Sequence, residues 1–312
     1  PSVIYGALRT AIATQNGIAL EEINSRLNEE NLHIRSIYLR MGGQIALPLP
    51  MDLVESKEKA SNIKKAEKEA KKYAVTRLSL IPASGLVFPA SKSKVKYLVE
   101  SRQYAQVDSI EHGAILTTEL EKYLAGNFEQ TEALKLTDYI REEPKVGIGR
   151  DDLTRFAEEG NLYRVDMKRF EDLQIGVSYE CEKYENISSL VLLGGERKLA
   201  AIALNRKPFH FPQTTIDFSS GRFLIYFATL AIFSNGEPTL SELGVSATLV
   251  AAYVGKPAHV GGYDIQKKEA KPMYRAVPAG SVFYYEAQGD ISSLNDKQGI
   301  QLSDKQNNQG FG

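Results

Sequence analysis

Residues 146–165, VGIGRDDLTRFAEEGNLYRV, hold side chains whose types and spacing suit the binding of a charged ligand. Gly147 and Gly149 carry no side chain that would shield the backbone, and Arg150 and Arg155 supply positive charge. Acidic residues in the same segment nearly cancel that charge. The segment lacks the apolar periodicity of a core element. We therefore expect this segment to bind a ligand. The type of ligand has to be inferred from the rest of the chain.

The turn sequence LLGGERK, residues 192–198, allows two interpretations. Gly194 and Gly195 followed by Glu196 are similar to the Gly-Gly-acidic hairpin on which nucleotide cyclases hold metal ions. That chemistry needs several carboxylates around divalent cations, whereas two basic residues follow directly here. A tight turn that presents backbone amides and Arg197 to a phosphate agrees better with the sequence.

Motifs for catalysis or for cofactor binding are missing from the sequence. It has no GxxxxGKS/T phosphate loop, no HExxH and no paired CxxC. The scattered histidines have no neighbouring nucleophile or carboxylate at a spacing typical of an acid–base pair. A single cysteine, Cys181, excludes an intramolecular disulfide and a multi-cysteine zinc site. We expect no catalytic residue, no metal and no cofactor, although residues far apart in sequence can still meet in space.

The composition of the 312-residue chain limits how it could bind a polyanion. Its net charge of −1 gives no overall attraction for phosphate, so a local basic patch would have to supply it. An acidic face elsewhere would then be available to protein partners. The 16 tyrosines can stack on single-stranded bases, although most of them are expected in the core or in strands.

No stretch of the chain predicts a membrane span. The longest apolar candidate, FLIYFATLAIF at 223–233, is shorter than the roughly 20 residues that cross a bilayer, and we interpret it as a buried strand. The first residues lack the basic start and cleavage site of a secretory signal. We therefore expect a cytoplasmic location.

The first part of the chain alternates helical and strand-like segments. A helix is expected over 3–13, with Ser2 as its N-cap and Asn16-Gly17 at its end. The segments that follow are predicted, in order, as a second helix (20–30), a strand (32–40) and a proline-containing extended segment or edge strand (44–54).

The run SKEKASNIKKAEKEAKK, residues 56–72, is rich in lysine and glutamate. This composition is typical of a solvated helix or a mobile insertion. An arm that faces RNA is the alternative interpretation.

Two further patterns predict local structure. Thr118 and Glu121 have capping-box spacing, which predicts a helix that ends at Gly126. Apolar and polar residues alternate with period two in 161–168 and again in 175–181. Because these two runs are close in sequence, they predict a hairpin with one solvent-exposed face.

A change in composition at 206–221 predicts a linker between two halves. The halves would be a domain at 1–212, with insertions, and a domain at 213–312. Three strand-like runs are predicted in the second half, at 222–233, 245–255 and 280–287. Helices mixed with strands indicate an α+β fold.

Six segments, taken in order, resemble one known family: PSVIYGALRT, LPLPMDLV, EPKVGIGRDDLTRFAEEGNLYRV, LLGGERK, GGYDIQKKEAKPMYRAVPAGSVFYYE and the terminal GFG. Their order and spacing span nearly the whole chain, and AEEGNLYRV and RAVPAGSVFYYE are the most specific. The chain resembles the third-subunit family of the type III-B CRISPR Cmr complex. That family belongs to the RAMP proteins and is similar to the subunit that caps the 5′ end of the guide in other CRISPR effector complexes.

The resemblance implies two ferredoxin-like (RRM-like) domains, each a βαββαβ sandwich, with a protruding β-hairpin and glycine-rich loops along guide RNA. It also implies a strand before the first helix and a longer C-terminus, which this sequence lacks. The implied partners are the 5′ tag of the guide crRNA, the large polymerase-like subunit and the backbone subunit. The implied function is non-catalytic: the chain would bind the tag and would bridge these two subunits. The resulting ribonucleoprotein would serve antiviral defence.

On this interpretation, glycines let the backbone approach phosphates, and cations bind phosphates or stack on bases. The acidic residues of 146–165 would orient the arginines or contact a neighbouring subunit. The candidate RNA-binding residues are Arg9, Gly147, Gly149, Arg150, Thr154, Arg155, Gly194, Gly195, Arg197, Gly261, Gly262, Lys271 and Arg275.

Alternative interpretations stay open. A strand bulge explains Gly261 and Gly262 equally well, and each cation could be an ordinary surface residue. The chain could instead be an endoribonuclease that processes guide precursors, as some RAMP relatives are, or a purely architectural subunit.

Overall fold

The computed structural model describes residues 1–56, 72–82, 97–101, 106–126, 128, 130–151, 153–154, 156–185, 187–194, 198–205, 209–264 and 267–312. The prediction for the lysine-rich run concerns residues that lie almost entirely outside these ranges.

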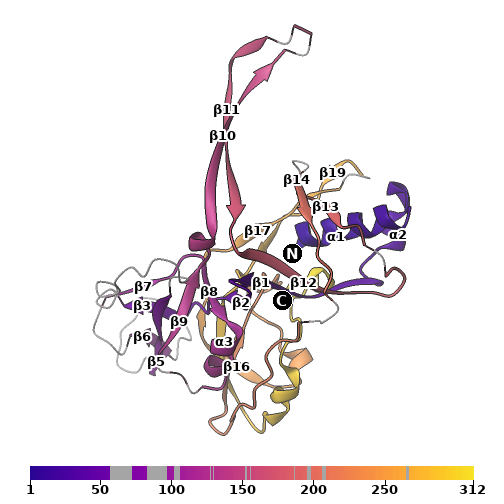
Figure 1. Ribbon diagram of the computed structural model, residues 1–312. Coiled ribbons are helices and arrows are strands. Elements are labelled where there is room, and N and C mark those ends of the chain that lie inside the picture. Colours follow the sequence, from indigo (N-terminus) through magenta and orange to yellow (C-terminus); the bar gives the residue numbers. More distant parts are fainter. Residues whose placement is uncertain are drawn as a thin grey trace.

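An eight-stranded antiparallel sheet forms the body of the first half, with the strand order β12-β1-β2-β8-β9-β4-β3-β7 (Figure 1). Its strands are β1 (Leu32–Met41), β2 (Gln44–Pro48), β3 (Leu53–Ser56), β4 (Tyr73–Arg77), β7 (Val107–Ser109), β8 (Gly113–Leu116), β9 (Gln130–Lys135) and β12 (Leu173–Cys181). The strand predicted over 32–40 is confirmed. The edge strand predicted over 44–54 is wrong, because β2 pairs on both sides and Pro48 stands at its end, where a missing N–H matters least.

The helices of the first half cover parts of this sheet. Their bounds are α1 (Ser2–Gln15), η1 (Leu20–Glu22), α2 (Ile23–Arg26), α3 (Thr117–Leu124) and η3 (Leu136–Tyr139). Leu8 and Ile12, four residues apart on one face of α1, pack with Leu32 and Ile34 of β1, which share one face of that strand. This helix–strand contact is one core of the first half.

Both predicted N-caps are wrong, although the first and third helices exist. Helix α1 already begins at Ser2, and no side chain caps it. Helix α3 begins at Thr117, and Glu119 accepts a hydrogen bond from Thr131 of β9. The carboxylate of Glu119, in the first turn of α3, is thus bound by a strand residue distant in sequence and does not cap the helix. The helix predicted over 20–30 shortens to η1 and α2.

The second half is built on a three-stranded antiparallel sheet with the order β15-β21-β16. The runs predicted at 245–255 and 280–287 are confirmed as β16 (Ala247–Tyr253) and β21 (Val282–Ala287). The run predicted at 222–233 forms β15 (Arg222–Tyr226) only, and 227–233 leaves the sheet, apart from an isolated bridge at Ala231. Phe223, Phe227, Phe283 and Tyr285 form an aromatic core on this sheet. The remaining elements of this half are β17 (Ala258–Val260), β18 (Tyr263–Asp264), β19 (Glu269–Ala270), β20 (Tyr274–Ala276), η4 (Ser241–Leu243), η5 (Ser292–Lys297) and η6 (Asn307–Gln309).

The fold is a mixed α/β arrangement with mostly antiparallel sheets and few helices. The structure does not display the two βαββαβ units that the resemblance implies. In the described part of 213–312, the only helices are short 3-10 turns, so the second half has no α-helix to cover its sheet. Loops and the aromatic side chains of the core cover the sheet instead of a helix. The domain boundary at 212/213 stays a prediction.

Smaller antiparallel pairs extend from the body. They are β5 (Ser79–Pro82) with β6 (Tyr97–Glu100), β10 (Ile140–Arg150) with β11 (Ala157–Phe170), and β13 (Leu190–Leu193) with β14 (Lys198–Ala201). The hairpin predicted between 161–168 and 175–181 is wrong, because the first run pairs with β10 and the second with β1.

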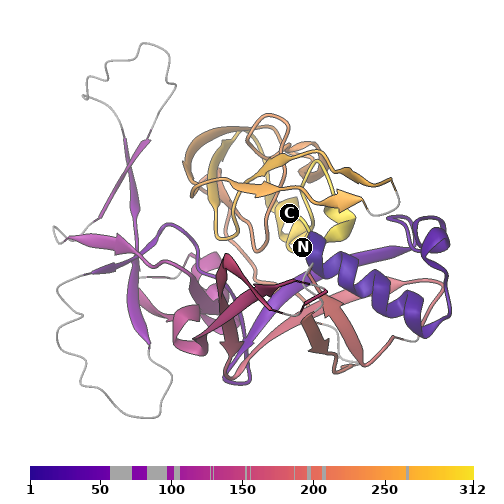
Figure 2. The same ribbon diagram turned by 90° about the horizontal axis from the view of Figure 1, so that it is seen from above.

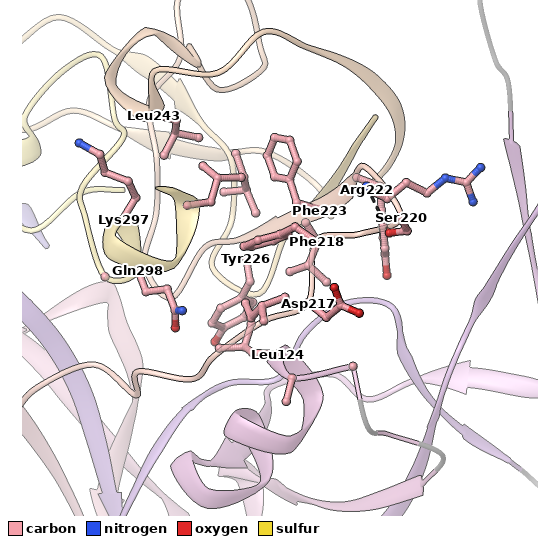
Figure 3. Close-up of a pocket in the computed structure, with 18 of the residues that line it drawn as sticks. Leu124, Asp217, Phe218, Ser220, Arg222, Phe223, Tyr226, Leu243, Lys297 and Gln298 are labelled. Carbon is pink, nitrogen blue, oxygen red and sulfur yellow. Dashed lines mark hydrogen bonds between the residues drawn. The ribbon is translucent and has the colours of Figure 1, made fainter. Parts of the chain in front are cut away.

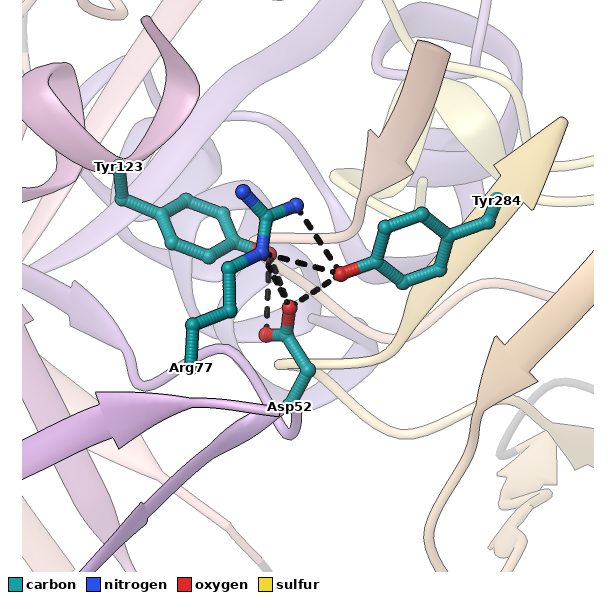
Figure 4. Close-up of polar contacts among 4 residues, drawn as sticks. All are labelled: Asp52, Arg77, Tyr123 and Tyr284. Carbon is teal, nitrogen blue, oxygen red and sulfur yellow. Dashed lines mark hydrogen bonds and ion pairs between the residues drawn. The ribbon is translucent and has the colours of Figure 1, made fainter. Parts of the chain in front are cut away.

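A buried polar cluster joins the two halves (Figure 4). The fully buried Asp52 carboxylate accepts hydrogen bonds from the Tyr123 hydroxyl at 2.9 Å and from Arg77 Nε at 3.1 Å, both in the first half. The Tyr284 hydroxyl, from β21, donates to the same carboxylate. Burial raises the pKa of Asp52, while Arg77 and the two hydroxyls act in the opposite direction. We call these four residues the Asp52 cluster.

The C-terminal GFG also packs between the halves, and the two ends of the chain lie close together in both views (Figure 2). Phe311 is fully buried against Ile232, Val260 and Ala276. A Cβ added at Gly310, whose φ is +87°, would lie 2.8 Å from Ile34 Cγ2 of β1. A glycine is therefore required at the point where the terminus passes β1.

Candidate nucleic-acid interface

Strands β10 and β11 form a long two-stranded hairpin that projects from the body (Figure 1). We call residues 140–170 the hairpin arm. Ile140 pairs directly with Phe170 at its base, and a register shift between Ile148 and Arg150 marks the approach to its turn. The segment 146–165, expected to grip a ligand, makes up the outer part of this arm.

Gly147 lies directly opposite Tyr163 in the arm. A Cβ at position 147 would come within 2.4 Å of Tyr163 Cζ, so the absence of a side chain makes room for the tyrosine ring. Gly149 makes similar room for Asn161, whose Cβ would be 2.7 Å away. The expected reason for these glycines was access of phosphate to the backbone. The structure instead shows that Gly147 lets an exposed aromatic ring lie flat across the arm.

Asp151 shapes the turn of the arm. Its Oδ1 accepts hydrogen bonds from the backbone N–H of Leu153 at 3.1 Å and from the N–H and hydroxyl of Thr154 at 2.7 and 2.8 Å. These donors lower the pKa of Asp151. Asp151 therefore orders the backbone of the turn, and the Thr154 hydroxyl already has a partner. Asp152 and Arg155 lie outside the described residues.

The cations of the arm divide into two groups. Arg141, Arg164 and Arg169 form ion pairs with acidic residues of or next to the arm. Lys145, Arg150 and Lys168 are exposed and have no ion-pair partner within the described part of the chain. Arg150 was among the residues predicted from the sequence, but the two lysines were not. The only feature that could have identified them is their position in polar, strand-like sequence.

The two faces of the arm differ in chemistry. Gly147 with Tyr163, and Lys145 with the opposite residue of β11, share one face because direct cross-strand partners project to the same side. Ile148 and Leu162 form a pair on the other face, next to Val146, and these three side chains are 48%, 70% and 66% exposed. One face thus offers an aromatic ring and a cation, and the other combines three exposed apolar side chains with Arg164, the partner of Val146.

Arg9 and the β13–β14 hairpin lie on the body. Arg9 Nη2 donates to Asn24 Oδ1 at 2.6 Å, its guanidinium lies 5.7 Å from the centre of the Tyr5 ring, and burial lowers its pKa. Arg9 is therefore held within the fold. Strands β13 and β14, on either side of the predicted turn, pair with each other, and Gly194 directly after β13 has φ +76°. Gly195 and Arg197 lie outside the described residues.

The remaining candidates come together in the ribbon formed by β17, β20, β18 and β19. The carbonyl of Gly262 accepts the N–H of Lys271 at 2.9 Å, and Arg275 pairs with His259 across β17 and β20. A Cβ at Gly261 would lie 3.0 Å from Met273 Cε. The structure thus gathers the candidates on the arm, on the ribbon and around α1, rather than in one enclosed site.

Comparison with known proteins decides the family. The family model described as CRISPR-associated protein (Cas_Cmr3) matches residues 1–312. The chain belongs to this family. The family supports a place for the chain as a subunit of a type III-B CRISPR effector. No curated protein matches the chain.

Solved structures similar to the chain include two cryo-EM structures of the type III-B Cmr-beta complex. One is bound to cognate target RNA and AMPPnP (state 1), and the other to cognate target RNA. Each shows 15% identity and a TM-score of 0.45 over 91% of this chain, covering 76% and 74% of the respective matched chains.

No described helix is long and apolar enough to cross a membrane. The described residues also contain no group of three or more His, Cys, Asp or Glu side chains placed to hold a metal ion.

Proposed function

We propose that this chain is a non-catalytic subunit that binds the 5′ tag of the guide crRNA and bridges the large polymerase-like subunit to the backbone subunit of a type III-B effector. Membership of the family supports this role. The observation that carries it is the hairpin arm, where the exposed Tyr163 ring lies across Gly147 on the same face as Lys145, a cation without an ion-pair partner among the described residues. Aromatic rings that stack on splayed bases, together with cations on phosphates, are the usual means of binding single-stranded RNA.

The two faces of the arm support the bridging part of the proposal. RNA would lie along the face with Tyr163 and Lys145. The opposite face carries Val146, Ile148 and Leu162 in the outer part of the arm, and exposed apolar side chains of this kind are typical of protein contacts. An arm with these two faces can hold a guide strand on one side and a neighbouring subunit on the other.

An endoribonuclease is supported less well. Cleavage of RNA needs a general base that reaches the substrate. The Asp52 cluster combines titratable groups with raised pKa values, but Asp52 has no exposed surface and holds the two halves together. We expect the purified chain to leave precursor RNA intact, and a product that disappears in a His or Tyr variant would favour the nuclease.

Reversing the charge of Lys145 and Arg150 tests the RNA-binding role. The double variant K145E/R150E is expected to bind tag RNA at least about tenfold more weakly, with the salt dependence of binding reduced by about two units of slope, because two phosphate contacts are lost. Fluorescence anisotropy with labelled tag RNA at several salt concentrations measures both quantities.

The matched control is R26E/R35E, which changes the net charge equally but replaces ion-paired arginines of α2 and β1. It is expected to change affinity by less than about threefold at physiological salt, where distant charges are screened. Equal losses in both variants would show that only overall charge matters. Unchanged binding in K145E/R150E would favour the architectural alternative.

A further inference from the structure

A cavity of about 420 Å³ lies between the C-terminal end of α3 and the second half of the chain (Figure 3). Its wall is mainly apolar and aromatic, with contributions from Leu124, Phe218, Phe223, Tyr226 and Leu243. Pockets of roughly 300–1,000 Å³ with apolar walls, at the junction of two structural units, are typical of small-molecule sites. The cavity is separate from the hairpin arm.

The neutral and acidic polar groups of the wall already have partners. Both Asp217 oxygens accept hydrogen bonds from Ser219, and the Gln298 amide exchanges two hydrogen bonds with the backbone of Thr214. The Gln298 amide is therefore already used within the fold, and Asp217 can only accept further hydrogen bonds, so it offers no donor to an anionic group. The surface that they leave to a ligand is apolar.

Positive charge borders this apolar surface. Arg77 lines the cavity, and its Nε and Nη2 are used within the Asp52 cluster. Its Nη1 has no protein partner in the described part of the chain and is directed away from the Asp52 carboxylate (Figure 4). Arg222 and Lys297 lie on opposite sides of the cavity (Figure 3). A partly buried guanidinium with an unused N–H favours a ligand that carries a negative charge.

We propose that this cavity binds a small amphipathic anion, with a compact aromatic or aliphatic body and a single carboxylate or sulfonate group. The body fills the space between Leu124 and the phenylalanines, and the anionic group accepts a hydrogen bond from Arg77 Nη1. This site is independent of the proposed RNA-binding function.

A fluorescent amphipathic anion, 8-anilinonaphthalene-1-sulfonate, tests the proposal with the purified full chain. We expect saturable binding at one site, at least tenfold tighter than that of the uncharged parent N-phenyl-1-naphthylamine. The variant L124W narrows the cavity and is expected to weaken binding of the sulfonate at least tenfold. The matched variant L199W places the same side chain on the exposed strand β14 and is expected to leave binding unchanged.

Three results would overturn the proposal. Equal affinity for the sulfonate and its uncharged parent would remove the role of Arg77. Unchanged binding in L124W, while its melting temperature stays that of the natural chain, would place the dye elsewhere on the surface. Displacement of the dye by single-stranded tag RNA would mean that a nucleotide, rather than a small amphipathic anion, occupies the cavity.

Discussion

Replacing Asp52 with alanine is expected to lower the free energy of unfolding by about 3–5 kcal/mol, because it breaks an ion pair whose carboxylate is fully buried and leaves the partly buried Arg77 cation without its counter-charge. The same change leaves the hydroxyls of Tyr123 and Tyr284 without their acceptor, and each lost buried hydrogen bond adds to the loss. Equilibrium unfolding in urea, followed by far-UV circular dichroism, measures the difference.

Glu180 provides the matched control, since it also pairs with an arginine but on the surface. The Arg35–Glu180 pair is 2.5 Å long, with both side chains more than half exposed, and such pairs contribute about 0–1 kcal/mol. Glu180→Ala is therefore expected to change stability far less than Asp52→Ala. If the two variants lost equal stability, the Asp52 cluster would not be what holds the two halves together.

Removing the hairpin arm is expected to abolish most RNA binding without unfolding the body. In this variant, residues 141–169 are replaced by a short Gly-Ser loop between Ile140 and Phe170, which are direct cross-strand partners. No described residue of 141–169 belongs to a hydrophobic core cluster, so we expect unfolding free energy within about 1 kcal/mol of that of the full chain.

We expect affinity for tag RNA to fall at least about 100-fold in this variant, since stacking on one aromatic ring and several phosphate contacts are lost together. Anisotropy titration with labelled tag RNA gives the affinity, and the thermal melting curve controls for folding. Full RNA affinity in a folded variant would move the RNA interface away from the arm. A large loss of stability would show that the arm supports the body.

Local patterns predicted individual elements well where a single segment decides its own structure. The helix expected before Gly17 and the strand character of β1 both appear in the structure. The partner of a strand could not be predicted in this way, because strand pairing depends on segments that are far apart in the sequence. The alternation in 161–168 was correct, but its partner is β10.

Strand β10 escaped prediction for a physical reason. Its sequence, IREEPKVGIGR, contains a proline and two glycines, which normally argue against a strand. In a two-stranded ribbon each strand has one free edge, so a proline can stand there without removing a ladder hydrogen bond. Gly147 is tolerated because the Tyr163 ring covers it. The hairpin arm itself was expected from the family resemblance alone.

The Asp52 cluster could not be predicted from the sequence either. Its only local signal is an acidic residue inside the apolar run MDLV. The partners of Asp52 lie 25, 71 and 232 positions away along the chain, and no periodicity links them. Long-range contacts of this kind follow from the packing of the two halves, which the sequence pattern does not specify.

The measurement that tests the central claim most directly is crosslinking in the assembled effector complex, with photoreactive nucleotides placed in the 5′ tag of the guide RNA. Peptide mapping on this chain would locate each adduct. We predict adducts within 145–165, with Tyr163 and the neighbouring cations as the contacting residues. Adducts found only on other subunits would contradict tag binding by this chain and would leave a structural bridge as the better account.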